Sequence, residues 1–254
     1  PAYFFIDIQP HQNDAFMQLV NTSPGVTKVE KTPMTRGRVV AVNGTPTKHV
    51  KPRQDIAWAV RGDRGLTYAS KKPTNAKIVS GKWWPDDYSG EPLISMGANV
   101  ARGLNLDIGD TITFNILGRE VKAKIANLRY IDWSNLQMNF VFIFSPGTLE
   151  AAPHSIVAAM YASELGVAEK VRNKVTDTLT NVSSISVKDA IKNAQDIIST
   201  VGFTIRTTSA FTLISGILVL ASALATQQQK RRYDATIYKV LGMSRMRILF
   251  LYLS

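Results

Sequence analysis

The 254-residue sequence contains no cysteine, and this absence removes several kinds of chemistry from consideration. Without thiol groups the chain forms no disulfide, no zinc–thiolate centre and no cysteine nucleophile. Histidine is scarce as well, because only His11, His49 and His154 occur, and their spacing matches no metal-binding motif. The sequence therefore predicts that this chain holds no metal ion.

The short motifs of common enzymes are also missing. Gly81-Lys82 has neither the preceding glycine nor the following Ser or Thr of a phosphate-binding P-loop, and no G-x-S-x-G nucleophile elbow occurs. Asp86 and Asp87 are adjacent in a turn-rich stretch, where neighbouring carboxylates point apart and form no catalytic pair. We therefore expect a chain that is not an enzyme, hydrolyses no ATP itself and binds no cofactor.

The most informative segment that is present covers residues 207–226, which read TTSAFTLISGILVLASALAT without a charged side chain. A helix of this length rises about 30 Å, which matches the hydrocarbon core of a bilayer. Lys230, Arg231 and Arg232 follow at once, as expected at the cytoplasmic side, and Arg206 marks the opposite end. The alternative is a buried helix of a soluble core, which typically explains apolar runs of about 10 to 14 residues.

The formal net charge of +11 is unevenly distributed. From Gln227 to the end there are six Lys or Arg and one Asp, a local charge of +5, and Arg206 adds one more. The remaining excess is spread over about two hundred residues and indicates no particular anionic partner. Because the concentrated part adjoins the apolar run, membrane topology explains it better than nucleic-acid binding, and we expect no nucleic-acid partner.

Two β-α-β patterns lie far apart in the sequence, and they predict a split layer of helices on a sheet. The expected elements are strands 2–9 and 26–31 around helix 10–20, then strands 156–161 and 182–187 around helix 164–179. The insertion between them, residues 33–147, is rich in strand and turn signals. Its expected elements are strands 38–42, 66–69, 78–79 and 92–96, helix 98–104, a hairpin of 111–116 with 120–128, and strand 140–144.

From Ser186 onward the apolar spacing is helical, with Ser186 as the expected N-cap and only Gly202 interrupting before the apolar run. We expect one helix of about forty residues, a polar stalk that continues into a membrane span. Beyond the basic cluster, Tyr233, Ile237 and Leu241 share one helical face and Gly242 is a natural stop. This short amphipathic helix either lies in the headgroup layer or docks on a cytoplasmic partner.

Residues 231–249, RRYDATIYKVLGMSRMRIL, resemble the cytoplasmic signature of the FtsX-like permeases, which are membrane subunits of ABC transporters and include the MacB and LolC/LolE types. The family pattern is a basic pair, an acidic residue, an apolar stretch and Leu-Gly-Ala-Ser/Thr-Arg. Met243 stands where alanine is usual, and Asp234 replaces the commoner glutamate. The matching positions are Arg231, Arg232, Asp234, Leu241, Gly242, Ser244 and Arg245.

A second stretch, residues 78–150, resembles the outer domain of the same permeases, closest to the large YbbP-type branch. The shared elements are a Gly-x-Trp-Trp segment, a short helix ending Leu-x-Leu, a Gly-Asp turn and a hairpin. The opening residues 3–12, YFFIDIQPHQ, fit that branch too, although His11 replaces the usual acidic residue. Because the chain begins at Pro1 without an initiator Met or a signal peptide and ends inside a new apolar run, we expect it to be a fragment of a longer membrane protein.

The resemblance implies an α+β extracytoplasmic region followed by a long stalk and transmembrane helix. Its expected parts are a porter-like subdomain (1–32 plus 148–187), an inserted β-rich subdomain (33–147), a stalk helix (188–206), a transmembrane helix (207–226), a cytoplasmic coupling helix and turn (227–247) and the start of a further span (248–254).

The resemblance also implies a function. It predicts a permease subunit in a bacterial inner membrane that transmits motion from a cytoplasmic ABC ATPase to residues 1–206 outside, for export or extraction of a hydrophobic or lipid-linked substrate. ATP and Mg²⁺ would bind the ATPase, and a periplasmic protein is a further candidate partner. The alternative is a signalling scaffold that transports nothing and regulates an extracytoplasmic hydrolase. The implied ATPase-docking residues are Arg231, Arg232, Tyr233, Asp234, Ile237, Lys239, Leu241, Gly242 and Arg245.

A group of aromatic residues leaves two interpretations open. Large aromatics most often pack under loops as part of the core, but an exposed group of them also suits a sugar, lipid or nucleic-acid ligand. Nothing in their spacing separates the two. The residues are Trp83, Trp84, Tyr88, Tyr130 and Trp133.

Overall fold

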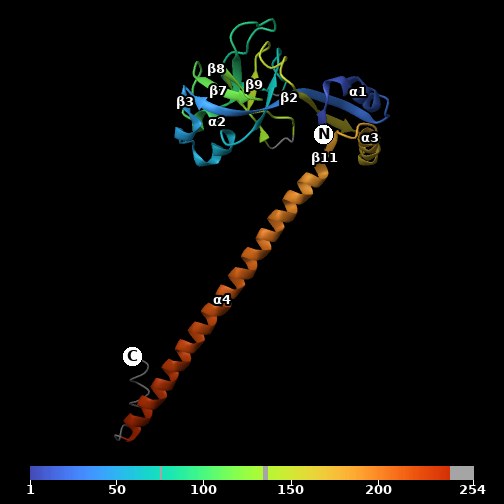
Figure 1. Ribbon diagram of the computed structural model, residues 1–254. Helices are drawn as coiled ribbons and strands as arrows, with labels where there is room; N and C mark the ends of the chain where they lie inside the picture. Colours follow the sequence, from blue (N-terminus) through green and yellow to red (C-terminus); the bar gives the residue numbers. More distant parts are fainter. Residues whose placement is uncertain (75, 134–136, 241–254) are drawn as a thin grey trace. The chain divides into compact units, whose positions relative to one another are not determined.

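The computed structural model describes residues 1–74, 76–133 and 137–240 and contains two compact units, Pro1–Ala190 and the part from Ile191 onward. The first unit holds every described strand, and the second consists of most of one long helix (Figure 1). A mixed α/β, sheet-rich region followed by a long apolar helix was the coarse prediction, and it is confirmed. The finer subdomain boundaries stay a prediction.

The two predicted β-α-β patterns meet in one antiparallel sheet. The first consists of β1 (Tyr3–Ile8), η1 (Pro10–Gln12), α1 (Asn13–Asn21) and the beginning of β2 (Val26–Val42). The second consists of β10 (Ser155–Ala162), α3 (Leu165–Thr178) and β11 (Ser183–Ser186). The strand order is β11-β1-β10-β2. β1 of the first pattern therefore lies between β11 and β10 of the second, and β10 lies between β1 and β2 of the first.

One hydrophobic cluster binds this sheet to its helices. Phe5 of β1 and Phe16 of α1 are fully buried and meet edge to face, with ring centroids 5.3 Å apart. Val171 and Val175 from α3 join the same cluster, so both helices cover one face of the sheet. Burial of such side chains contributes about 1.5–3 kcal/mol each, which fixes the helices against the strands.

β2 differs from its prediction, because strands 26–31 and 38–42 are one continuous strand of 17 residues. Pro33 lies in the middle of this strand. Around Pro33, β2 pairs with β10 along one edge, where Pro33 lies opposite Ile156. The other edge of β2 has no described strand partner there, so the lack of an N–H on proline costs no hydrogen bond along that edge. Further along, β2 changes partners to β4 and β7 and thereby joins the sheet to the insertion.

The insertion contributes nine short elements and one long strand. These are β3 (Thr45–Pro46), η2 (Thr47–His49), η3 (Gln54–Ala59), β4 (Arg64–Tyr68), β5 (Lys77–Gly81), β6 (Leu93–Gly97), α2 (Ala98–Gly103), β7 (Thr111–Ile116), β8 (Arg119–Tyr130) and β9 (Phe142–Phe144), with β8 the long strand. The predicted β7–β8 hairpin is confirmed, and its two-residue turn places Leu117 and Gly118 at φ 50° and 90°, as a type I′ turn requires.

Six strands of this region close on themselves. β2 pairs with β4, β4 with β9, β9 with β6, β6 with β8, β8 with β7, and β7 again with β2. A second hydrophobic cluster fills the ring, and at its centre Phe114 meets Phe142 and Phe144, each with centroids 5.0 Å away. Closure leaves few open strand edges, which suits a small β-rich body in water.

The helix α4 (Val187–Val240, 54 residues) begins directly after β11 without a linker. The predicted N-cap is confirmed, because the Ser186 hydroxyl oxygen accepts a hydrogen bond from the Asp189 backbone N–H at 3.1 Å. The Val187 N–H donates to the carbonyl of Ala2, also at 3.1 Å. The first turn of α4 is therefore tied to β1 of the sheet. The helix passes Gly202 without a break and is longer than the forty residues expected.

Candidate functional site

The central part of α4 has the properties of a membrane span. The stretch Val187–Gln227 includes a window of mean hydropathy 1.9, and none of that window is buried inside the described structure. Large apolar side chains such as Leu213, Ile217 and Leu220 are more than half exposed. A helix with apolar residues exposed on all sides is costly in water but matches a lipid surrounding. By length and composition α4 is able to cross a bilayer.

The polar side chains of the apolar run support the same reading. Thr208, Thr212 and Ser222 donate hydroxyl hydrogen bonds to the backbone carbonyls four residues earlier, at 2.8–3.0 Å. Thr207 and Thr226 at the two ends do the same. In a hydrocarbon environment an unpaired hydroxyl is expensive, so these internal bonds let the helix carry hydroxyl groups without water.

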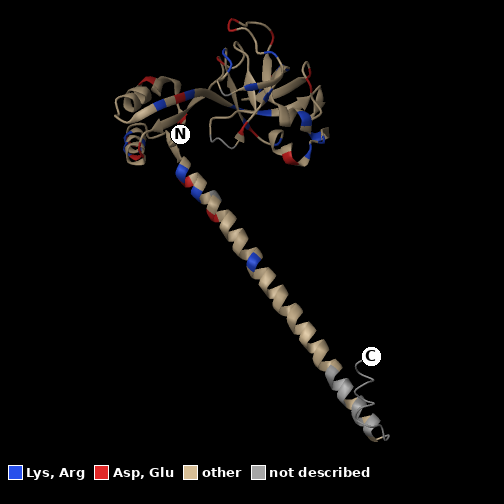
Figure 2. Ribbon diagram, turned by 180° about the vertical axis from the view of Figure 1, so that it is seen from behind, with Lys and Arg blue, Asp and Glu red and all other residues tan. Residues whose placement is uncertain are grey.

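A long central stretch of α4 carries no charged side chain. Figure 2 shows coloured Lys, Arg, Asp and Glu residues along the first part of α4, and the sequence has none from residue 207 to residue 229. Arg206 is exposed at the edge of the uncharged run, where a long cationic side chain can extend toward headgroups. The uncharged run is therefore bounded by cations at both ends, Arg206 on one side and Lys230 on the other.

The residues with an implied docking role divide into two groups. Arg231, Arg232, Tyr233, Asp234, Ile237 and Lys239 lie in the last turns of α4. Leu241, Gly242 and Arg245 lie outside the described residues. Tyr233, Ile237 and Val240 are exposed, and their spacing of four and three residues puts them on one helical face. The structure thus continues the span helix into this segment, and the docking role stays a prediction.

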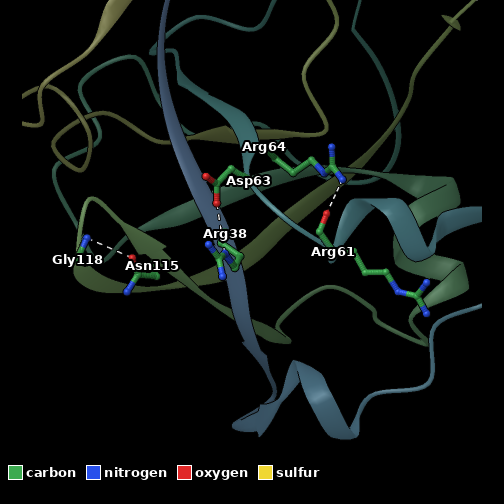
Figure 3. A network of polar contacts seen from close by, with 6 residues as sticks. All are labelled: Arg38, Arg61, Asp63, Arg64, Asn115 and Gly118. Carbon is green, nitrogen blue, oxygen red and sulfur yellow. Dashed lines mark hydrogen bonds and ion pairs between the residues drawn. The ribbon is translucent and has the colours of Figure 1, made fainter.

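Within the described ranges, no three His, Asp or Glu side chains come together in a way that would hold a metal ion. A polar group on the insertion contains Arg38, Asp63 and Arg64 (Figure 3). Arg38 Nε lies 3.3 Å from Asp63 Oδ1, and both side chains are more than half exposed. Arg64 donates to the carbonyl of Arg61. A solvated ion pair of this kind contributes little, about 0–1 kcal/mol, and offers no buried chemistry.

The structure separates the aromatic residues into two groups. Trp84 is buried, and its indole N–H donates to the Ala69 carbonyl at 2.8 Å, while Trp83 donates to Ser70. The Tyr88 hydroxyl donates to the Glu91 carbonyl. These three are packing residues. Tyr130 and Trp133 are instead exposed.

Sequence reasoning missed a partner of Trp133. Trp58 of η3 meets Trp133 edge to face, with centroids 5.9 Å apart, and the Arg64 guanidinium lies 5.4 Å from the Trp58 ring. Nothing in the sequence links residues 58 and 133, because the pair forms only when the strands of the insertion close.

A cavity of about 550 Å³ lies in the first unit between β2, β4 and the end of β8. Arg129 of β8 and Thr67 of β4 line it, and both are almost completely buried. Burial lowers the pKa of Arg129 to about 10, so the guanidinium remains charged at neutral pH. Sequence reasoning missed this site as well. The two-residue period of a strand could have indicated that Arg129 is buried, because it is separated from the buried Ala123 and Ile125 by an even number of residues.

At the cavity rim the charges are paired. Lys28 Nζ lies 2.6 Å from Glu30 Oε1, and this hydrogen bond from Lys28 holds the pKa of Glu30 below its ordinary value. The Tyr161 hydroxyl donates to the other Glu30 oxygen at 3.1 Å. Burial raises the pKa of the Tyr68 phenol, which also lines the cavity. With its pKa lowered, Glu30 is ionised at neutral pH, and the raised pKa values of the Tyr68 and Tyr161 phenols keep both neutral.

Comparison with known proteins gives one informative match. No family model matches the chain. The chain is 24% identical, over 243 residues and 95% of its length, to the "Uncharacterized ABC transporter permease YbbP" of Escherichia coli (strain K12). The resemblance to ABC transporter permeases that the two motifs predicted is thereby confirmed. The matched part spans 28% of the length of that relative.

Proposed function

We propose that this chain is part of the membrane subunit of an ABC transporter and works without catalysing a reaction itself. In this proposal a separate cytoplasmic ATPase binds ATP and Mg²⁺, and α4 transmits its motion to the unit Pro1–Ala190 on the other side of a bacterial inner membrane. The subunit is of the FtsX-like, MacB-related kind, with residues 1–32 and 148–187 as its porter-like part. The cargo is a hydrophobic or lipid-linked molecule that is extracted or exported.

The continuity of α4 is the observation that supports this proposal most. One helix runs from the strand β11 to the cationic segment, with no turn between them. Because Ser186 pairs with Tyr3 and the Val187 N–H bonds to the Ala2 carbonyl, the helix begins on the sheet itself. A helix is stiff along its axis, so a displacement at the cationic end is passed to β11 and β1 and is not absorbed by a linker.

The docking segment provides the test. We expect Arg231→Glu, Arg232→Glu and Lys239→Glu together to abolish co-purification of the ATPase with the full-length subunit, because they reverse the charge of the proposed contact surface. The ATPase is identified by ATP hydrolysis in the purified complex. The matched control reverses three exposed lysines far from the docking segment in the sequence, Lys174, Lys188 and Lys192, and should leave the complex intact.

Reversing the cationic cluster also weakens the topology signal, so a second variant separates docking from orientation. Ile237→Asp keeps every cation of the segment and changes only its exposed apolar face. We expect it to insert normally and to lose the ATPase. An intact, ATP-hydrolysing complex with both the triple variant and Ile237→Asp would refute the docking assignment.

A further inference from the structure

The cavity beside β2 has the size and position of a ligand site. Its volume of about 550 Å³ falls within the range of about 300–1,000 Å³ that is usual for small-molecule sites. Residues of β2, β4, β8 and β9 line it, together with residues 137–140. It therefore lies beside β2, the strand that pairs with β10 in its first part and with β4 and β7 further along.

Arg129 is a buried cation that lacks an opposite charge. Its side chain is only 4% exposed. One guanidinium nitrogen, Nη2, donates to the carbonyl of Phe140, but Nε has no partner within the described chain. No described carboxylate forms an ion pair with it, and burial alone accounts for its lowered pKa. A buried charge without compensation is costly, so proteins keep one chiefly where something binds it.

Thr67 supplies a second unpaired donor at the same cavity. Its residue is 3% exposed, and its hydroxyl Oγ1 has no hydrogen-bond partner among the described residues. Buried polar groups are nearly always satisfied by protein or by a bound molecule. Two buried donors that line one cavity and lack acceptors point to an acceptor from outside the chain, and the charge of Arg129 favours an anion.

The other charged groups at the cavity are already engaged. Lys28 pairs with Glu30, and Lys31 Nζ donates to Asn13 Oδ1 at 2.7 Å. Asp132 likewise has an interaction partner. Among the described lining residues one cation is thus left for a ligand, which fits a single negative charge better than a doubly charged phosphate monoester. Around it the lining includes apolar side chains, namely Pro33, Met138, Phe140 and Ile143.

We propose that this cavity binds a single-chain carboxylate amphiphile, whose carboxylate accepts hydrogen bonds from Arg129 and Thr67 and whose alkyl chain packs against Met138, Phe140 and Ile143. The site adds a ligand to the proposed function without depending on it, because binding requires neither ATP nor the ATPase. A failed binding test therefore leaves the permease assignment standing, and a failed docking test leaves this site standing.

The test uses the full-length protein in nanodiscs of zwitterionic phosphatidylcholine and measures binding by saturation-transfer NMR, with empty nanodiscs as the blank. Octanoate is the probe. Octanol keeps the chain without the charge, and acetate keeps the charge without the chain. We expect saturable octanoate binding that exceeds the binding of either comparison compound by about tenfold or more.

Three variants identify the residues. Arg129→Met keeps an unbranched side chain and removes the charge, and it should weaken octanoate binding roughly 10- to 100-fold. Thr67→Val, which keeps the shape of the side chain, should weaken it by a smaller factor, roughly threefold to tenfold. The control Arg53→Met removes an exposed arginine that pairs with Asp55 away from the cavity and should change nothing.

Thermal melting shows that the variants are folded. Because Arg129→Met removes an uncompensated buried charge, we expect its melting temperature to equal or exceed that of the parent chain. Should it fail to fold, Arg129→Lys and Thr67→Val decide the question, since both are expected to weaken binding. Equal binding of octanol, equal binding of acetate, or undiminished octanoate binding in the folded variants would each overturn the proposal.

Discussion

Ile217→Arg together with Leu218→Arg should remove α4 from the membrane. Both side chains lie in the middle of the uncharged run, and both are more than half exposed, so no protein group shields a new charge there. Each arginine at the centre of a spanning helix costs about 2.5–3.5 kcal/mol, and two of them lower the inserted fraction by about a thousandfold or more. The measurement is the share of chain that resists carbonate extraction from membranes.

The same helix supplies a matched control. Ile197→Arg with Ile198→Arg places the same pair of charges on two equally exposed isoleucines, ten residues before the uncharged run begins. We expect this variant to remain fully membrane-bound, because the proposed topology places the stalk in water or at the headgroups. If both double variants behave alike, residues 207–226 are not the segment that crosses the bilayer.

Gly81→Ala should destabilise the first unit by about 3 kcal/mol or more. Gly81 ends β5 at φ 80°, a conformation that side chains disfavour by about 1–2 kcal/mol. A Cβ there would also run into the Ala126 carbonyl and lie 2.9 Å from the Asn127 Cα, and both obstacles are backbone of the paired strand β8. The backbone has no rotamer to change, so the two strands must separate.

Gly118→Ala is the comparison that isolates the steric part. Gly118 has a similar φ of 90°, but a Cβ there meets nothing within 4 Å. We expect a loss of only about 1 kcal/mol, since conformational strain is the whole effect. Urea unfolding of both variants, followed by tryptophan fluorescence, measures the difference. Equal losses would mean that the close approach of β5 to β8 is absent in the protein.

This result would also explain part of the Gly-x-Trp-Trp motif. The close contact at Gly81 lets β5 lie against β8, and the chain then turns so that the Trp84 indole reaches the Ala69 carbonyl. The glycine and the two tryptophans therefore serve packing. Their resemblance to a permease family motif assigns them no ligand.

Local signals in the sequence predicted much of the fold. The β7–β8 hairpin followed from turn signals in the insertion, and α3 followed as the helix of the second β-α-β pattern. The continuity of β2 was not predictable from the sequence. A proline is typical of a strand end, and whether Pro33 is tolerated inside a strand depends on one edge of β2 being unpaired there. α4 continues beyond its apolar part because no glycine or proline occurs between Gly216 and Gly242.

Long-range features were beyond the reach of the sequence. The closed ring needs the parallel pairings β4–β9 and β6–β8, which join segments far apart in the chain and leave no local trace. The cavity shows the same limit. The strand period of β8 indicates that Arg129 is buried, but whether a carboxylate meets it depends on every strand around it. The candidate membrane span, in contrast, is a property of one continuous segment and was predictable directly from the sequence.

Labelling of single cysteines tests the central claim, that α4 crosses a bilayer and carries its cationic end to the ATPase side. The 254 residues contain no cysteine, so Thr45→Cys, Leu218→Cys and Tyr233→Cys each give one unique thiol in this chain. A membrane-impermeant maleimide should label Thr45→Cys in cells with a permeabilised outer membrane. Tyr233→Cys should react only after the inner membrane is opened, and Leu218→Cys only in detergent. Labelling of Leu218→Cys in intact membranes, or of Tyr233→Cys from the outside, would contradict the account.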